Sequence, residues 1–147
     1  MRLKKYTDFA LRVLIYAGSK ENGEKTSIKE ISETFFISTE HIRKVVHQLS
    51  KHNYIETVRG RNGGIVLSKA PESINIGEVV RVMENDFVMV ECFDGDTNLC
   101  VITPSCSLKH VLNRALHSFF KVLDEYTLAD LLTNQQELQF LLSGSQE

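Results

Sequence analysis

Two closely spaced helix starts near the N-terminus constrain this fold more than any other feature of the sequence. Ser27 and Glu30 form a capping box, which predicts a short helix after Ser27. Ser38 is a second strong N-cap, and the residues after it predict a helix over 39–51. Two short helices joined by a tight turn are typical of a helix-turn-helix.

The second of these helices has two different faces. Its inward stripe is apolar and consists of Ile42, Val45, Val46 and Leu49. Its outward face is polar and mainly basic, and consists of Glu40, Arg43, Lys44, His47 and Lys51. Taken alone, this pattern also fits an ordinary amphipathic surface helix with solvated charges.

A basic hairpin directly after the second helix decides between these interpretations. Residues 54–58 and 65–67 alternate like strands, and the segment Arg59-Gly60-Arg61-Asn62-Gly63-Gly64 between them contains an Asn-Gly turn. A phosphate-binding glycine loop would be followed by a helix, whereas a strand follows here. Helix, helix and basic hairpin in this order predict a winged helix-turn-helix.

The predicted winged helix assigns candidate DNA contacts to individual residues. Those at or near the start of the second helix are Ser38, Thr39, Glu40, His41, Arg43 and Lys44. Glu40 can accept a hydrogen bond from cytosine and Arg43 can grip guanine, so these two are the expected base readers. Contacts to phosphate are expected from Lys44, Lys51, Arg59 and Arg61, and contacts to the minor groove from Asn62, Gly63 and Gly64.

Charge is divided unevenly along the 147 residues. Residues 1–70 carry 13 Lys and Arg against 7 Asp and Glu, a balance of +6, while residues 71–147 carry 4 against 12, a balance of −8. This asymmetry fits one part that meets a polyanion, although an unevenly charged solvated surface would show it too. No apolar run suits a membrane span or a signal peptide, so we expect a cytoplasmic protein. Nucleophile elbow, Walker loop and dinucleotide fingerprint are absent, so we do not expect an enzyme.

The remaining helices predict a second, dimer-forming half. A first helix is expected from a cap at Thr7 or Asp8 to about Ser19. Further helices are expected from about residue 73 to 85, from Ser107 for about 20 residues, and more weakly over 128–142. The long helix from Ser107 carries a broader apolar stripe than a small domain covers by itself, which favours a homodimer. The predicted fold is mainly α with a small β-hairpin: a winged helix-turn-helix domain at 1–70, then a cluster-binding loop and dimerisation helices at 71–147.

All three cysteines lie in the loop before the long helix: Cys92, Cys100 and Cys106. An exported disulfide framework is not expected in the cytoplasm, so they are thiols or ligands. Zinc sites favour paired C-x2-C spacing, which is missing here, whereas the wider spacing suits a larger object such as an iron–sulfur cluster. Unrelated buried thiols remain the simpler alternative.

The sequence resembles the family of iron–sulfur winged-helix transcription repressors (NsrR/IscR-like), and most closely its nitric-oxide-sensing branch. The resemblance covers nearly the whole chain and rests on the segment 6–12, the helix starting at Ser38, the 59–64 turn and the three cysteines. It implies a homodimer that represses nitric-oxide detoxification and nitrogen-oxide metabolism genes until nitric oxide destroys a 4Fe–4S cluster. One cluster per subunit would be held by Cys92, Cys100 and Cys106.

The fourth ligand is the open part of that resemblance. In nitric-oxide-sensing members it is an aspartate of the partner subunit's first helix, and Asp8 matches it here. Arg12, one turn on, is expected to hold that carboxylate. The simpler interpretation of Asp8 is an acid in a first helical turn. His110, Asp94, Asp96 or a solvent molecule are alternatives, and a 2Fe–2S cluster or a thiol-redox switch is the alternative sensor.

Overall fold

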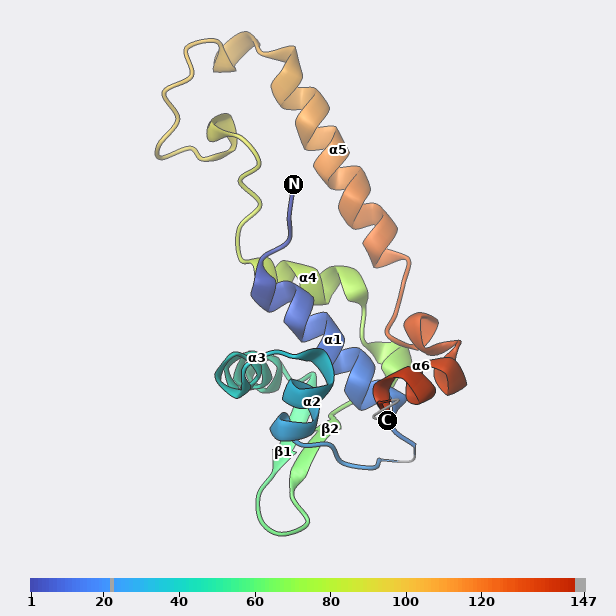
Figure 1. Cartoon of the computed structure of the whole chain (residues 1–147). Helices are drawn as coiled ribbons and strands as arrows, with labels where there is room; N and C mark the ends of the chain where they lie inside the picture. Colours follow the sequence, from blue (N-terminus) through green and yellow to red (C-terminus); the bar gives the residue numbers. More distant parts are fainter. Residues whose placement is uncertain (22, 145–147) are drawn as a thin grey trace.

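A computed structural model describes residues 1–21 and 23–144 as a mainly helical chain with a single two-stranded hairpin (Figure 1). This confirms the predicted fold class. The α-helices are α1 (Lys5–Ser19), α2 (Ile28–Phe35), α3 (Thr39–Lys51), α4 (Ile76–Glu84), α5 (Ser107–Asp124) and α6 (Gln135–Leu142). The strands are β1 (Ile55–Val58) and β2 (Gly64–Leu67), and short 3₁₀ helices are η1 (Pro71–Ser73), η2 (Glu91–Phe93), η3 (Thr103–Ser105) and η4 (Ala129–Leu132).

Side-chain caps begin both helices of the helix-turn-helix. The Ser27 hydroxyl accepts a hydrogen bond from the Glu30 backbone N–H at 3.1 Å, and Ser38 accepts one from His41 at 3.2 Å. Each cap satisfies a backbone donor that the helix itself leaves unpaired. The predicted starts of α2 and α3 are therefore confirmed.

The first helix starts differently from its prediction. It begins at Lys5 without a side-chain cap, so the expected cap at Thr7 or Asp8 is wrong. Thr7 is fully buried inside the first turn, where its side chain packs into the core. The carboxylate of Glu84, at the end of α4, accepts the Lys4 backbone N–H at 2.7 Å. A residue 80 positions away thus satisfies a donor at the start of α1.

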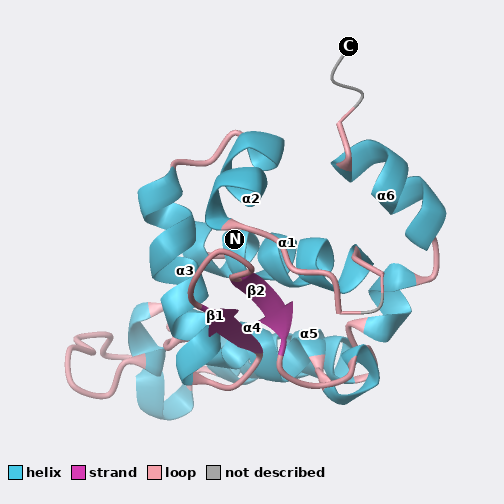
Figure 2. Cartoon of the chain, turned by 90° about the horizontal axis from the view of Figure 1, so that it is seen from below, coloured by secondary structure: helices cyan, strands magenta, loops and turns pink. Residues whose placement is uncertain are grey.

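The hairpin is antiparallel and is anchored near its turn. Ile55 pairs with Leu67 and Val58 with Gly64. Thr26, in the connection before α2, exchanges two backbone hydrogen bonds with Ile65, at 3.1 and 2.7 Å. Figure 2 views the molecule from the hairpin end, with α2 and α3 on one side of the hairpin and α6 on the other. The connection before α2 is therefore tied to the wing close to the hairpin turn.

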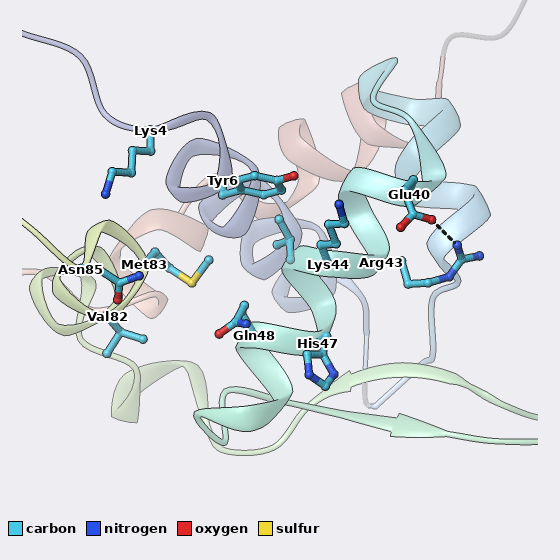
Figure 3. A pocket seen from close by; sticks show the side chains of 11 residues that line it. Lys4, Tyr6, Glu40, Arg43, Lys44, His47, Gln48, Val82, Met83 and Asn85 are labelled. Carbon is cyan, nitrogen blue, oxygen red and sulfur yellow. Dashed lines mark hydrogen bonds and ion pairs between the residues drawn. The ribbon is translucent and has the colours of Figure 1, made fainter.

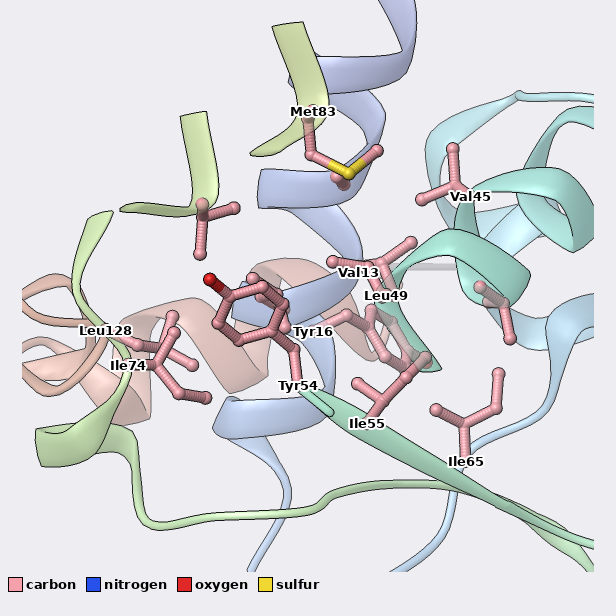
Figure 4. Packing of buried hydrophobic residues seen from close by; sticks show 14 of the residues in the cluster. Val13, Tyr16, Val45, Leu49, Tyr54, Ile55, Ile65, Ile74, Met83 and Leu128 are labelled. Carbon is pink, nitrogen blue, oxygen red and sulfur yellow. The ribbon is translucent and has the colours of Figure 1, made fainter. Parts of the chain in front are cut away.

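The hydrophobic core forms around α1 (Figure 4). Val13 and Leu14 of α1 are fully buried and pack with residues of α3, β1 and β2. Ile74 before α4 and Leu128 before η4 belong to the same cluster, so apolar packing continues past residue 70. The division into 1–70 and 71–147 stays a prediction.

The long helix α5 packs only in part. Near its end Phe120 is buried and its ring meets that of Phe87 at 4.5 Å between centroids. Near its start Leu108 and Val111 are more than half exposed. The connection between α4 and α5 projects beside this end of α5, away from the hairpin (Figure 1). None of the described helices is long and apolar enough to cross a membrane.

The C-terminal region differs from its prediction. A single helix over 128–142 is wrong, because a non-helical Asn134 separates η4 from α6. The break lets α6 turn back onto α1, where the side-chain amides of Gln135 and Gln139 donate to the carbonyl of Ser19 at 3.2 and 2.8 Å. The last carbonyls of α1 lack partners within their own helix, so this contact satisfies one of them.

Candidate nucleic-acid interface and cysteine-rich connection

The outward face of α3 is the centre of the candidate interface. The predicted inward stripe of α3 is buried, and Glu40, Arg43, Lys44 and His47 are exposed (Figure 3). Arg43 Nη1 and Glu40 Oε2 form an ion pair at 2.8 Å, with both side chains about 60% exposed. Exposed pairs of this kind contribute at most about 1 kcal/mol to stability. Arg43 and Glu40 can therefore give up their ion pair and bind base edges at little cost in free energy.

A cleft of about 640 Å³ borders this face between α3, the start of α1 and the end of α4 (Figure 3). Lys4, Tyr6 and Met83 are among the residues that line it. The ammonium group of Lys4 pairs with Asp86 at 3.0 Å. Sequence reasoning did not place Lys4 or Tyr6 beside α3, because their proximity depends on how α1 crosses α3.

The wing presents its cations at an exposed tip. Arg59, Arg61 and Asn62 are exposed, in keeping with the expected contacts to DNA backbone and minor groove. The Lys25 ammonium donates to the Asn62 carbonyl at 2.8 Å, which brings a further cation to the tip. Lys25 was missed because it lies 37 residues from Asn62 in the sequence.

The two adjacent glycines of the wing have a structural role of their own. A Cβ at Gly63 would lie 2.2 Å from the carbonyl oxygen of Val58, and one at Gly64 would lie 2.7 Å from that of Thr26. No side chain fits at those separations. The glycines therefore shape the hairpin turn and its anchorage, whether or not they also approach the minor groove.

A polar pair on α1 lies next to the helix-turn-helix. Arg12 grips the Asp8 carboxylate through two hydrogen bonds, Nε to Oδ1 at 3.0 Å and Nη2 to Oδ2 at 2.7 Å. This confirms the pair expected from their spacing. The Arg12 guanidinium also lies 5.8 Å from the centre of the Phe35 ring of α2, within cation–π range. The Asp8 side chain is about half exposed, so it remains accessible to a further partner.

The three cysteines occupy the projecting connection. Cys92 lies in η2 and Cys100 just before η3, and Cys106 is the N-cap of α5. The Cys106 sulfur accepts the Lys109 backbone N–H at 3.4 Å, an arrangement that suits a thiolate ligand at a helix N-terminus. All three are free thiols and Cys100 is exposed. The donor set is soft and accessible, which fits an iron–sulfur group.

These ligands do not converge within one chain. Across residues 1–21 and 23–144, no three His, Cys, Asp or Glu side chains form a group that could hold a metal ion. Asp8 lies on α1, whereas the cysteines lie in the connection before α5. The expected ligand set therefore requires rearrangement of the connection, and Asp8 would have to come from a second subunit.

The alternative fourth ligands differ in availability. Asp94 accepts hydrogen bonds from the Asp96 backbone N–H at 3.2 Å and the Thr97 hydroxyl at 2.7 Å. These bonds, that from Thr97 foremost, hold the pKa of the Asp94 carboxyl below its usual value. Both of its oxygens are thus used within its own turn. His110 is exposed on α5, one helical turn after Cys106, and stays an open alternative.

Comparison with known proteins places these features in a family. Residues 3–134 match the Rrf2 family, described as iron-dependent transcriptional regulators. The HTH-type transcriptional regulator NsrR of Oceanobacillus iheyensis is 60% identical over 142 residues, 97% of each chain. NsrR of Bacillus subtilis is 54% identical over 142 residues, again 97% of each chain.

Solved structures agree with this assignment. CymR, the global cysteine regulator of B. subtilis, superimposes with a TM-score of 0.75 at 25% identity, covering 91% of this chain and 98% of that one. IscR of T. potens has the same fold, with a TM-score of 0.73 at 23% identity over 95% and 91% of the two chains. These relatives are transcriptional regulators and not enzymes, as expected from the sequence. This chain is a DNA-binding transcriptional regulator and belongs to the Rrf2 family.

Proposed function

We propose that this chain is a cytoplasmic, homodimeric repressor that senses nitric oxide through a 4Fe–4S cluster, one per subunit. Its targets would be genes of nitric-oxide detoxification and nitrogen-oxide metabolism. The chain's identity to NsrR regulators supports the branch. The observation that carries the proposal is the gathering of all three cysteines in one accessible connection, outside the buried core.

Exposed apolar side chains support the homodimer. They lie on the first part of α5 and in the cysteine-rich connection, and include Leu99, Val101, Ile102, Leu108 and Val111. Exposed apolar groups gathered in this way mark an interaction surface. A second copy of the chain would cover them and bring Asp8 of the partner subunit to the cysteines.

The residues that would hold the cluster are Cys92, Cys100, Cys106 and Asp8 of the partner subunit. A bound cluster would supply an iron site at which nitric oxide reacts. A carboxylate is a harder ligand than a thiolate, so the Asp8 position would be the one most easily given up. Arg12 grips both oxygens of Asp8, so it orients the carboxylate in one direction. Release of Asp8 would free α1 from the other subunit's connection.

In the DNA-binding state, α3 of each subunit would enter a major groove with Glu40 and Arg43 at the base edges. Lys44, Arg59 and Arg61 would neutralise phosphates, joined by Lys25 from the connection before α2. Two half-sites about one helical turn apart are expected for a twofold dimer. A shift of α1 would alter the spacing of the two recognition helices and weaken operator binding.

The proposal is tested by anaerobic purification with iron and sulfide analysis, an absorbance spectrum and operator binding, before and after nitric oxide. We expect about four irons per chain, bleaching by nitric oxide, and loss of operator binding. Asp8→Ala should keep iron but alter the nitric-oxide response, while the control Asp94→Ala should behave as wild type. About two irons per chain would favour a 2Fe–2S sensor of cluster status. A colourless protein without iron would refute the cluster and leave a thiol switch.

A further inference from the structure

We infer that His41 is a positioning residue that fixes the start of the recognition helix to α1, and that it does not read bases. Three aromatic rings meet between the start of α1 and the start of α3. The His41 ring meets Tyr6 at 5.8 Å between centroids, edge to face at 88°, and meets Phe9 at 6.1 Å. Tyr6 and Phe9 meet each other at 6.5 Å. All three separations lie in the range of favourable aromatic contacts.

The three aromatic rings lie at the contact between the start of α1 and the start of α3. His41 is in the first turn of α3, and its backbone N–H donates a hydrogen bond to the Ser38 hydroxyl, the N-cap of the helix, at 3.2 Å. Tyr6 and Phe9 are in the first two turns of α1 and lie on either side of Asp8 in the sequence. A displacement at Asp8 therefore reaches the N-terminal end of α3 through a direct ring contact.

A second contact joins the same part of α1 to the other helix of the motif. Arg12, which grips Asp8, lies over the Phe35 ring of α2. The segment from Tyr6 to Arg12 thus touches α3 through His41 and α2 through Phe35. Both helices of the helix-turn-helix would follow α1 as one body.

The same contacts leave His41 poorly suited to base reading. His41 is exposed, as Glu40 and Arg43 are, but its ring also contacts two rings of α1, and leaving them for a base edge would give up both contacts. Glu40 and Arg43 are exposed on the outward face of α3 and remain the expected base readers.

The test compares two substitutions at His41 with a control at Arg43. The probe is a duplex selected by the wild-type protein from a random-sequence library, and the protein is used as purified anaerobically. His41→Phe keeps a ring, so we expect affinity within about twofold of wild type and an unchanged base preference on reselection. His41→Ala loses the ring, and we expect roughly tenfold weaker binding with the preference unchanged. Arg43→Ala, at an expected base reader, should change the preference at one base pair.

Double-mutant cycles then separate positioning from simple loss of contact. The effects of Tyr6→Ala and His41→Ala on affinity should be strongly non-additive, because both break the same contact. This cycle does not depend on a bound iron–sulfur cluster. A second cycle, of Asp8→Ala with His41→Ala, rests on the proposed function. In it, the effect of Asp8→Ala on operator affinity should largely disappear when His41 is already replaced by Ala.

Each arm has an outcome that overturns it. An altered base preference in His41→Phe would make His41 a reader, and additive effects of Tyr6→Ala and His41→Ala would refute the positioning role. A protein without iron would refute the proposed function, and the Tyr6–His41 cycle and the reselection would still decide the role of His41. Circular dichroism and urea unfolding establish that each variant is folded.

Discussion

Replacing Phe36 by glycine is expected to stabilise the protein, although it removes a large apolar side chain. Phe36 ends α2 with φ 55° and ψ 41°, a left-handed conformation, and its N–H donates to the carbonyl of Ser32. The side chain is 97% exposed, so its removal loses almost no packing within the chain. Glycine adopts this conformation without the clash that a Cβ makes, and it is the residue most often found there.

The magnitude follows from two opposing contributions. The left-handed conformation costs an L-residue roughly 1–2 kcal/mol. Glycine has more freedom in the unfolded chain, which offsets about 0.5–1 kcal/mol of that gain. The difference lies between about 0 and 1.5 kcal/mol, so the free energy of unfolding should rise by about 0.75 kcal/mol, the middle of that range, which corresponds to roughly 1.5–3 °C in Tm for a chain of this size.

Urea unfolding followed by circular dichroism measures the change as a shift of the midpoint at constant slope. Phe36→Ala is the matched control, since it removes the same ring but keeps the Cβ, and it should not raise the midpoint. A destabilised Phe36→Gly protein would refute the reasoning, because it would mean that the ring makes a stabilising contact. A gain of equal size in Phe36→Ala would show that the ring, and not the backbone, is the source of the strain.

Three further predictions concern other positions. Thr7→Val should raise the free energy of unfolding by about 1–2 kcal/mol, since the buried Thr7 hydroxyl has no hydrogen-bond partner among the described residues; an unchanged urea midpoint would contradict this. Gly63→Ala should cost about 1–3 kcal/mol and weaken operator binding, because its Cβ would meet the Val58 carbonyl at 2.2 Å; wild-type binding by fluorescence anisotropy would oppose it. The hydrogen bonds from Arg81 hold the pKa of Asp124 below its usual value of 3.8, so this pair stabilises the fold above that pH and is lost as pH falls through the lower value of the folded state. Asp124→Asn should therefore lower Tm at neutral pH and match wild type in strong acid, and a difference that persists there would contradict the assignment.

The sequence predicted the elements whose local signals agree with their tertiary setting. Ser27 and Ser38 are strong caps ahead of amphipathic runs, and both helices start where expected. The hairpin turn was equally clear, because Gly63 sits where a side chain would collide with backbone. At these positions the local preference and the packed structure favour the same conformation.

Predictions failed where a distant residue replaced the local signal. The start of α1 was expected at a cap by Thr7 or Asp8, but the helix begins after Lys4, whose backbone N–H donates to the Glu84 carboxylate of α4. The break at Asn134 depends on the docking of α6 against Ser19, more than a hundred residues earlier in the chain. Neither contact has a signature in the neighbouring sequence.

The candidate site shows the same division. The Asp8–Arg12 pair follows from helical spacing alone, whereas the approach of Lys25 to the wing and of Tyr6 to His41 depends on how separate elements pack. Individual contact residues could thus be named from the sequence. The way in which they are joined to one another could not.

These contacts would allow the proposed sensor in the cysteine-rich connection to act on the recognition helix α3, although the two lie apart in the chain. The cysteine-rich connection begins directly after α4, where Glu84 and Asp86 both bind Lys4, the residue that precedes α1. A movement of the connection would therefore reach the start of α1 within its own chain, and under the proposed function a partner subunit's connection would act on the same helix at Asp8. If Tyr6 and Phe9 pass such a movement to His41, displacements of an ångström or two at α1 would misplace α3. Nothing in this route requires unfolding or a long-range change of shape, since each step is a direct contact between neighbouring side chains.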